Sequence, residues 1–127
     1  MKRFRDTNYF ITEDGQLYKF WPEKVYHHSR GTQIVPEHWS KLKLHPTDKR
    51  KVRLAYNFSI NGKQRIIAIS RVVAECYLGP IPDGYEVDHI DNNPLNNHYT
   101  NLQFLTKEQN VQKLRGNYKN RYFLACK

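Results

Sequence analysis

The chain has 127 residues, about the length of one domain, and 39% of them are hydrophobic, which suffices for a modest core and argues against a disordered tail. The 21 Lys and Arg outnumber the 12 Asp and Glu, and the formal net charge of +9 suggests a polyanion as partner. No apolar run approaches the roughly 18 residues of a membrane-spanning helix, and no signal peptide is recognisable. Cys76 and Cys126 form no CxxC pair, which argues against a disulfide scaffold and a cysteine-based zinc site. We therefore expect a soluble cytoplasmic protein without a membrane partner.

The first predicted hairpin lies near the N-terminus. A β-prone run covers residues 8–11, and polar and apolar residues alternate over 16–20. The dipeptide Asp14-Gly15 between them is typical of hairpin turns. Residues 22–50 are interrupted by three prolines and a glycine, so we expect irregular structure there.

A second hairpin is predicted further along the chain. Alternation over residues 51–59 places apolar side chains on one face of a strand, and a second strand is expected over 65–69. Asn61-Gly62 between them is the strongest short hairpin signal in the sequence. The two hairpins together predict a small antiparallel β module.

A helix is expected after this module. Ser70 is a suitable N-cap, and residues 71–78 place apolar side chains on one helical face. Gly79 stands where a helix C-terminus commonly has glycine, and Pro80 follows it. The pattern therefore predicts one short helix with an apolar face.

The next segment alternates between strand and helix signals around a polar, asparagine-rich loop. The expected order is strand, loop, strand and helix, over residues 85–90, 91–100, 101–105 and 107–114. Thr106 and Gln109 fit a capping box at the start of the last helix. The fold class predicted for the whole chain is α+β.

Charge is distributed unevenly along the chain. Residues 41–53 hold six basic residues and one acidic residue, and residues 111–127 hold five basic residues and no acidic one. Between residues 75 and 108 the balance reverses, with six acidic residues and one basic. Ordinary solvated faces produce such a pattern. A metal-dependent phosphodiesterase also produces it, because basic segments neutralise phosphates and acidic groups hold a divalent cation.

Four polar residues in the strand–loop–strand–helix segment could carry chemistry. Asp88 and His89 are adjacent at the end of the first strand, whose geometry sends neighbouring side chains to opposite faces. Asn101 opens the second strand, and Asn110 lies on the first turn of the helix, where the helix end favours phosphate. A histidine suits general-base work at neutral pH, and Mg²⁺ held by two protein oxygens keeps sites for phosphate.

These residues occur in a recognisable string. Val87-Asp88-His89-Ile90-Asp91 is followed by asparagines at 93, 96, 97 and 101, by Leu102, and later by Asn110. The string resembles the HNH endonuclease family, whose fold is a ββα-metal hairpin plus helix. The preceding Arg71-Val72-Val73-Ala74-Glu75 and the two hairpins resemble the N-terminal module of phage- and intron-encoded HNH homing endonucleases.

The resemblance implies a role for each of the four residues. His89 would be the general base that deprotonates the attacking water, and Asp88 the acidic metal ligand beside it. Asn101 would be the central asparagine of the motif, which holds the hairpin loop together. Asn110 would be the second metal ligand, at a position where the family often has histidine. Because an amide oxygen is a hard ligand, one Mg²⁺ or Mn²⁺ per active site is expected, with no small-molecule cofactor.

Double-stranded DNA is the expected partner, bound through the basic segments and the helix that precedes the motif. The residues expected to contact DNA are Lys41, Lys43, Lys49, Arg50, Lys51, Arg53, Arg71, Lys113, Arg115, Lys119 and Arg121. The aromatic residues near the C-terminus have two open interpretations, since they could contact DNA or pack on the core.

Three parts are expected along the chain: a β-rich DNA-docking module over 1–69, the nuclease motif with its preceding helix over 70–116, and a basic aromatic arm over 117–127. The function that the resemblance implies is a metal-dependent DNA endonuclease, homing-type or another phage nuclease, in a prokaryotic or phage-infected cell. It would act as a monomer or homodimer and would nick or cut both strands. Two alternatives are a DNA-binding module with a degenerate nuclease site and an interaction protein that uses the hairpin as a scaffold.

Overall fold

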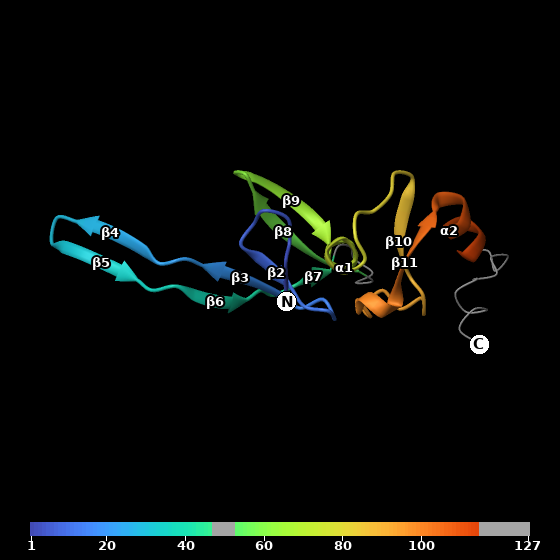
Figure 1. The fold of residues 1–127 in the computed structure, drawn as a ribbon, viewed down its shortest axis with the longest axis horizontal. Helices are drawn as coiled ribbons and strands as arrows, with labels where there is room; N and C mark the ends of the chain where they lie inside the picture. The colour runs from blue at the N-terminus through green and yellow to red at the C-terminus, as the bar shows by residue number, and fades with distance from the viewer. Residues whose placement is uncertain (47–52, 115–127) are drawn as a thin grey trace.

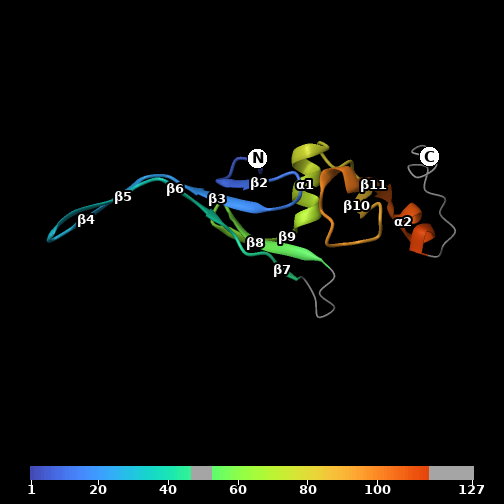
Figure 2. The ribbon, with the colours of Figure 1, turned by 90° about the horizontal axis from the view of Figure 1, so that it is seen from below.

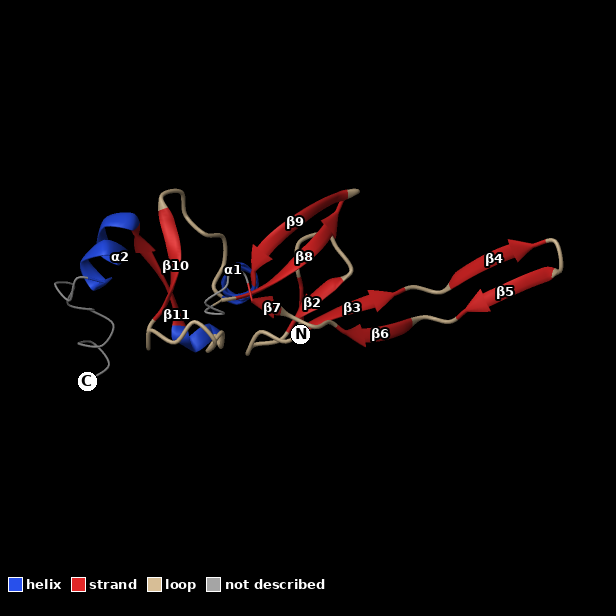
Figure 3. Ribbon diagram, turned by 180° about the vertical axis from the view of Figure 1, so that it is seen from behind, coloured by secondary structure: helices blue, strands red, loops and turns tan. Residues whose placement is uncertain are grey.

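The computed structural model describes residues 1–46 and 53–114, and it is elongated, with a β-hairpin arm at one end and a helix at the other (Figure 1). The first strands are β1 (Lys2–Arg3), β2 (Tyr9–Ile11), β3 (Leu17–Trp21), β4 (Lys24–His28), β5 (Gly31–Val35), β6 (His38–Lys41) and β7 (His45–Pro46). The remaining elements are β8 (Leu54–Ile60), β9 (Lys63–Ala68), α1 (Ile69–Tyr77), β10 (Tyr85–His89), a 3₁₀ turn (Tyr99–Asn101), β11 (Leu102–Thr106) and α2 (Lys107–Leu114). Strands dominate the part from β1 to β9, and α2 lies beyond β10 and β11 (Figure 3). The α+β fold class is confirmed.

The first predicted hairpin is confirmed. Strands β2 and β3 pair antiparallel in a four-stranded sheet of order β1-β2-β3-β6. Gly15 in the turn has a φ of +90°, a left-handed conformation that glycine adopts without strain. A β-carbon at Gly15 would lie 3.0 Å from the β-carbon of Asn97 and 3.1 Å from Cγ2 of Ile69. The turn therefore requires glycine for two reasons: the left-handed backbone conformation, and the lack of space for a side chain beside Asn97 and Ile69.

The expectation of irregular structure over residues 22–50 is wrong for much of that range. Strands β4 and β5 form a two-stranded hairpin, and β6 pairs with β3, so the chain runs out along an arm and returns (Figure 2). Pro22 and Pro36 interrupt the ladder on opposite strands without ending the ribbon. Both faces of β4 and β5 are largely exposed, so their sequence lacks the apolar alternation that marks a half-buried strand.

The second predicted hairpin is also confirmed. Strands β8 and β9 pair antiparallel, from Ala55 opposite Ala68 to Ile60 opposite Lys63, in a three-stranded sheet of order β7-β8-β9. Asn61 and Gly62 have φ angles of 52° and 77°, as a two-residue turn between twisted strands requires. The expected strand over 51–59 begins at Leu54 within the described part, and residues 51 and 52 lie outside it.

Helix α1 lies between the N-terminal sheets and the β10–β11 hairpin and contacts both (Figure 1). Its side chains at Ile69, Val72 and Val73 are fully buried. The core runs from the first strand to the last hairpin, through Phe4, Tyr9, Ile11, Leu17, Phe58, Ile67, Ile69, Val72, Val73, Ala74 and Leu102. Apolar burial around α1 thus connects the β module to the hairpin that follows it.

The predicted start of α1 is wrong, and its predicted end is confirmed. The N-cap is Ala68, which makes no side-chain capping bond within the described residues, and Ser70 is buried inside the first turn. Strand β9 leads directly into the helix, so the apolar Ile69 takes the first helical position. At the other end Gly79 has a φ of 107°, and its N–H donates to the Ala74 carbonyl at 3.1 Å.

The predicted strand–loop–strand–helix order is confirmed. Strand β10 pairs antiparallel with β11, from Tyr85 opposite Thr106 to His89 opposite Leu102. The Thr106 hydroxyl accepts from the Gln109 N–H at 3.2 Å, and the Gln109 side chain accepts from the Thr106 N–H at 2.9 Å. This reciprocal capping box begins α2. Neither helix in the described ranges has the length and apolar character needed to cross a membrane.

Candidate active site

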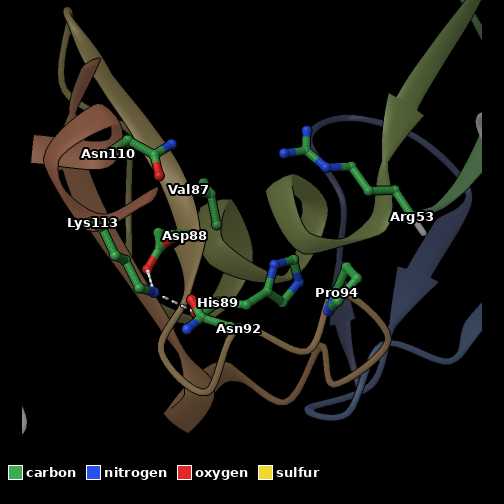
Figure 4. Close-up of a pocket in the computed structure, with 8 residues that line it drawn as sticks. All are labelled: Arg53, Val87, Asp88, His89, Asn92, Pro94, Asn110 and Lys113. Carbon is green, nitrogen blue, oxygen red and sulfur yellow. Dashed lines mark hydrogen bonds and ion pairs between the residues drawn. The ribbon is translucent and has the colours of Figure 1, made fainter. Parts of the chain in front are cut away.

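A surface cavity of about 420 Å³ is lined by β10, the loop that follows it and α2, with Arg53 on the opposite side (Figure 4). The residues that line it are Arg53, Val87, Asp88, His89, Asn92, Pro94, Asn110 and Lys113. Three of the four predicted site residues therefore meet in one place. Asn101 does not line the cavity and lies in the loop behind it.

His89 is the last residue of β10, and only 9% of its surface is exposed. Its Nε2 donates to the Oδ1 of Asn97 at 2.8 Å, and Asn97 is itself 4% exposed. Because a carbonyl oxygen only accepts, this contact places the proton of a neutral imidazole on Nε2 and leaves Nδ1 as the proton acceptor. Sequence reasoning assigned Asn97 to loop structure and missed its contact with His89.

Asp88 points away from His89, toward α2 (Figure 4). Its Oδ2 accepts from the Nζ of Lys113 at 2.6 Å and from the Nε2 of Gln103 at 2.9 Å. The two side chains leave β10 in opposite directions, as the strand geometry predicts. They nevertheless flank one cavity, because the chain turns into the loop directly after His89.

Asn110 faces the cavity from the first turn of α2. Its Nδ2 donates to the Oε2 of Glu86 at 2.8 Å. Glu86 lies two residues before Asp88 on β10 and therefore on the same face of the strand. With the amide nitrogen directed to Glu86, the amide oxygen of Asn110 points toward Asp88 (Figure 4). The sequence contains no local signal for this role of Glu86.

The donor set matches a hard divalent cation. Asp88 and Asn110 contribute a carboxylate and an amide oxygen to the same cavity, and such oxygens are preferred by Mg²⁺ and Mn²⁺. No group of three or more His, Cys, Asp or Glu in ranges 1–46 and 53–114 is placed to hold a metal. A softer, fully protein-ligated metal such as structural zinc does not fit these residues.

Asn101 is bound into the loop that joins β10 to β11. Its Oδ1 accepts from the Asp91 N–H at 3.1 Å, and its Nδ2 donates to Asp91 Oδ1 and to the Asn96 carbonyl, both at 2.9 Å. Asp91 also accepts from the Asn93 N–H and the Asn96 side chain. The hydrogen bond from Asn96, followed by the one from Asn93, holds the pKa of Asp91 below its ordinary value. This network keeps the loop in one conformation beneath the cavity.

The residues predicted to contact DNA are placed differently from one another. Lys41, Lys43, Arg53 and Arg71 are exposed, and Arg53 also lines the cavity. Lys113 is only 10% exposed and is paired with Asp88. The other predicted contacts lie outside the described residues: Lys49, Arg50, Lys51, Arg115, Lys119 and Arg121.

A second cavity, of about 470 Å³, is lined by Arg5, Arg65 and Arg71 together with the end of β9. Arg5 forms two hydrogen bonds to the Glu75 carboxylate, at 3.0 and 3.1 Å. Arg65 and Arg71 are both exposed. Sequence reasoning identified Arg71 alone, because Arg5 and Arg65 are far from it along the chain.

Comparison with known proteins agrees with the fold and with the motif found in the sequence. A family model described as HNH endonuclease matches residues 68–112. A protein of Acanthamoeba polyphaga mimivirus, named as an uncharacterised HNH endonuclease, is 33% identical over 84% of this chain and 27% of its own length. The Bacillus subtilis SPbeta prophage protein YosQ, named as a candidate HNH homing endonuclease, is 29% identical over 87% of this chain and 54% of its own length.

A solved structure shows the same fold. The HNH homing endonuclease I-HmuI, solved in a study of its DNA binding and cleavage, superposes on 97% of this chain with a TM-score of 0.62 and 24% identity. The chain covers 61% of that protein and about a quarter to a half of the two curated relatives. The segment that matches the family model, residues 68–112, contains all four predicted site residues. Over residues 68–112 the chain matches the HNH endonuclease family.

Proposed function

We propose that the chain is a divalent-metal-dependent endonuclease that hydrolyses phosphodiester bonds in double-stranded DNA. The observation that carries this proposal is the single cavity in which Asp88, His89 and Asn110 meet. The family match over residues 68–112 and the homing-endonuclease names of the relatives support a phage or homing-type nuclease. The proposed organisation is a docking module over 1–69, the nuclease motif over 70–116 and a C-terminal arm over 117–127.

His89 is the general base in this proposal. Asn97 holds Nε2–H, so the lone pair of Nδ1 takes a proton from the attacking water. Imidazole is the side chain best suited to accept and release a proton near neutral pH. Burial of both His89 and Asn97 restricts the rotation of the ring and keeps the base in one orientation.

Asp88 and Asn110 would hold Mg²⁺ or Mn²⁺, one ion per site. When bound, the ion would neutralise charge on the pentavalent phosphorus and stabilise the departing 3′ oxygen. Glu86 orients the Asn110 amide, and Gln103 orients the Asp88 carboxylate. Cleavage in this manner leaves 5′-phosphate and 3′-hydroxyl ends.

The shape and charge of the molecule support double-stranded DNA as partner. The β4–β5 arm is a two-stranded ribbon, and ribbons of this width fit the major groove. It carries exposed Lys24, Tyr26 and Arg30. In this proposal Arg65 and Arg71, which line the second cavity, bind a backbone phosphate, since guanidinium groups bind phosphate through paired hydrogen bonds.

The test of the proposal is a cleavage assay on supercoiled plasmid. With Mg²⁺ we expect conversion to open circle or linear DNA, and with excess chelator we expect none. Early accumulation of open circle would indicate nicking by a monomer, and linear DNA formed from the start would indicate two coordinated sites. DNA binding without cleavage in Mg²⁺ or Mn²⁺ would instead support the alternative, a DNA-binding module with a degenerate nuclease site.

Removal of the Arg71 charge should weaken DNA binding mainly because one contact with the phosphate backbone of DNA is lost. For Arg71→Gln we expect the slope of log affinity against log salt to decrease by about 1, with little effect on which sequences are bound. Lys107→Gln is the control, because it removes one charge from an exposed position outside both cavities. The affinity would be measured by fluorescence anisotropy over a range of salt concentrations. Equal slopes for wild type and Arg71→Gln would remove Arg71 from the DNA interface.

A further inference from the structure

The Lys113 side chain is enclosed at the edge of the active-site cavity. Its ammonium donates to Asp88 Oδ2 at 2.6 Å and to the His89 backbone carbonyl at 2.8 Å. The side chains of Lys113 and Asp88 are only 10% and 11% exposed. A pair this buried is weakly screened by salt, so the ammonium is a strong local charge in the site.

The position of Lys113 on α2 brings it to the proposed metal ligands. It lies three residues after Asn110, and residues at this spacing share one face of a helix. Asn110 and Lys113 therefore approach β10 together, the first bonded to Glu86 and the second to Asp88. The lysine occupies one oxygen of the carboxylate that the metal would need.

We propose that Lys113 is a built-in counter-ion of Asp88 that competes with the divalent metal. Without metal, the ammonium neutralises the carboxylate and keeps it oriented beside Gln103. Binding of a divalent cation to Asp88 places like charges within a few ångströms, which is strongly unfavourable in a partly buried site. The metal must therefore displace Lys113 from Asp88. The released ammonium remains at the rim of a cavity that the proposed reaction fills with a phosphate.

This inference rests on the proposed function, since it requires that Asp88 bind a metal. Competition and a purely structural role for the ion pair predict opposite changes in metal affinity when Lys113 is replaced. A lysine that only shapes Asp88 for the metal would improve metal affinity, and its loss would weaken binding. A lysine that competes with the metal lowers affinity, and its loss strengthens binding.

The experiment is a Mn²⁺ titration of the DNA-free protein followed by electron paramagnetic resonance. Lys113→Gln keeps a side-chain donor for Asp88 but removes the charge, and we expect it to bind Mn²⁺ at least about tenfold more tightly than wild type. Lys107→Gln, an exposed lysine on the same helix, should change the affinity by less than about twofold. Asp88→Asn should lose most Mn²⁺ binding. Circular dichroism checks that each variant is folded.

The outcomes separate the two proposals. If wild type binds Mn²⁺ through Asp88 and Lys113→Gln binds it equally or less tightly, the competition is refuted and the metal site stands. If neither wild type nor Lys113→Gln binds Mn²⁺, both the proposed metal site and the competition by Lys113 are refuted. Tight binding by Lys113→Gln alone would support competition in its strongest form, in which the lysine blocks the site.

A second measurement needs no variant. Lysine acylation followed by mass spectrometry reports how accessible each ammonium is in the wild-type protein. Lys113 should be labelled slowly without metal and several-fold faster with saturating Mg²⁺, while Lys107 serves as the reference for reagent activity. Unchanged protection of Lys113 with metal bound would show that the ion pair persists, which would overturn the displacement.

Discussion

Replacement of His89 by alanine should reduce plasmid cleavage by a factor of about 10² to 10⁴, the usual contribution of a general base. Affinity for DNA should stay within about twofold, because His89 is buried against Asn97 and is not one of the exposed basic side chains expected to contact the DNA backbone. The measurements are single-turnover cleavage of supercoiled plasmid with Mg²⁺ and anisotropy on a DNA duplex with Ca²⁺ in its place.

The matched control for this variant is His45→Ala. His45 is exposed on β7, outside the residues that line the cavity. We expect its cleavage rate to equal that of wild type within about twofold. If His89→Ala cleaved as fast as His45→Ala, His89 could not be the base. A variant that lost binding as well as cleavage would point to a folding defect, which thermal unfolding would reveal.

Replacement of Asn101 by alanine should have the largest effect on stability. The side chain makes three hydrogen bonds across the loop, two to Asp91 and one to the Asn96 carbonyl. At roughly 1 kcal/mol for each bond, we expect a loss of about 2–3 kcal/mol in the free energy of unfolding. This corresponds to a decrease in Tm of about 10 °C for a domain of this size. Thermal unfolding followed by circular dichroism measures both.

Asn96→Ala gives a graded comparison for the same loop. Its side chain makes one hydrogen bond, to Asp91 Oδ2, so about a third of the effect is expected. Cleavage should decrease with both variants, and more with Asn101→Ala, because the loop lies between His89 and β11. A melting temperature for Asn101→Ala equal to that of wild type would mean that the loop is held by other contacts.

The elements that the sequence predicted correctly are those specified by adjacent residues. Asn61-Gly62 can adopt the left-handed angles of a two-residue turn, and Thr106 with Gln109 can cap a helix without help from the rest of the fold. The order of strand, loop, strand and helix follows from such local signals. The proximity of Asp88, His89 and Asn110 then follows from antiparallel pairing and one short helix.

The features that the sequence did not predict depend on partners distant along the chain. Strands β4 and β5 bury neither face, so no hydrophobic alternation marks them. Ser70 resembles an N-cap, but the burial of Ile69 against the core sets the start of α1 two residues earlier than predicted. Glu86 and Lys113 acquire their partners only when α2 packs on β10.

The close contact at the β2–β3 turn links the N-terminal β module to the loop between β10 and β11. Gly15 leaves no space for a β-carbon beside Asn97, and the Tyr99 N–H donates to the Glu13 carbonyl of the same turn at 3.0 Å. The N-terminal module thus packs directly against Asn97, the residue that is hydrogen-bonded to His89. A chimaera that joined residues 70–114 of this chain to another N-terminal module would have to reproduce the close contact between Gly15 and Asn97. A change in the N-terminal module is therefore expected to shift Asn97 and, through it, His89.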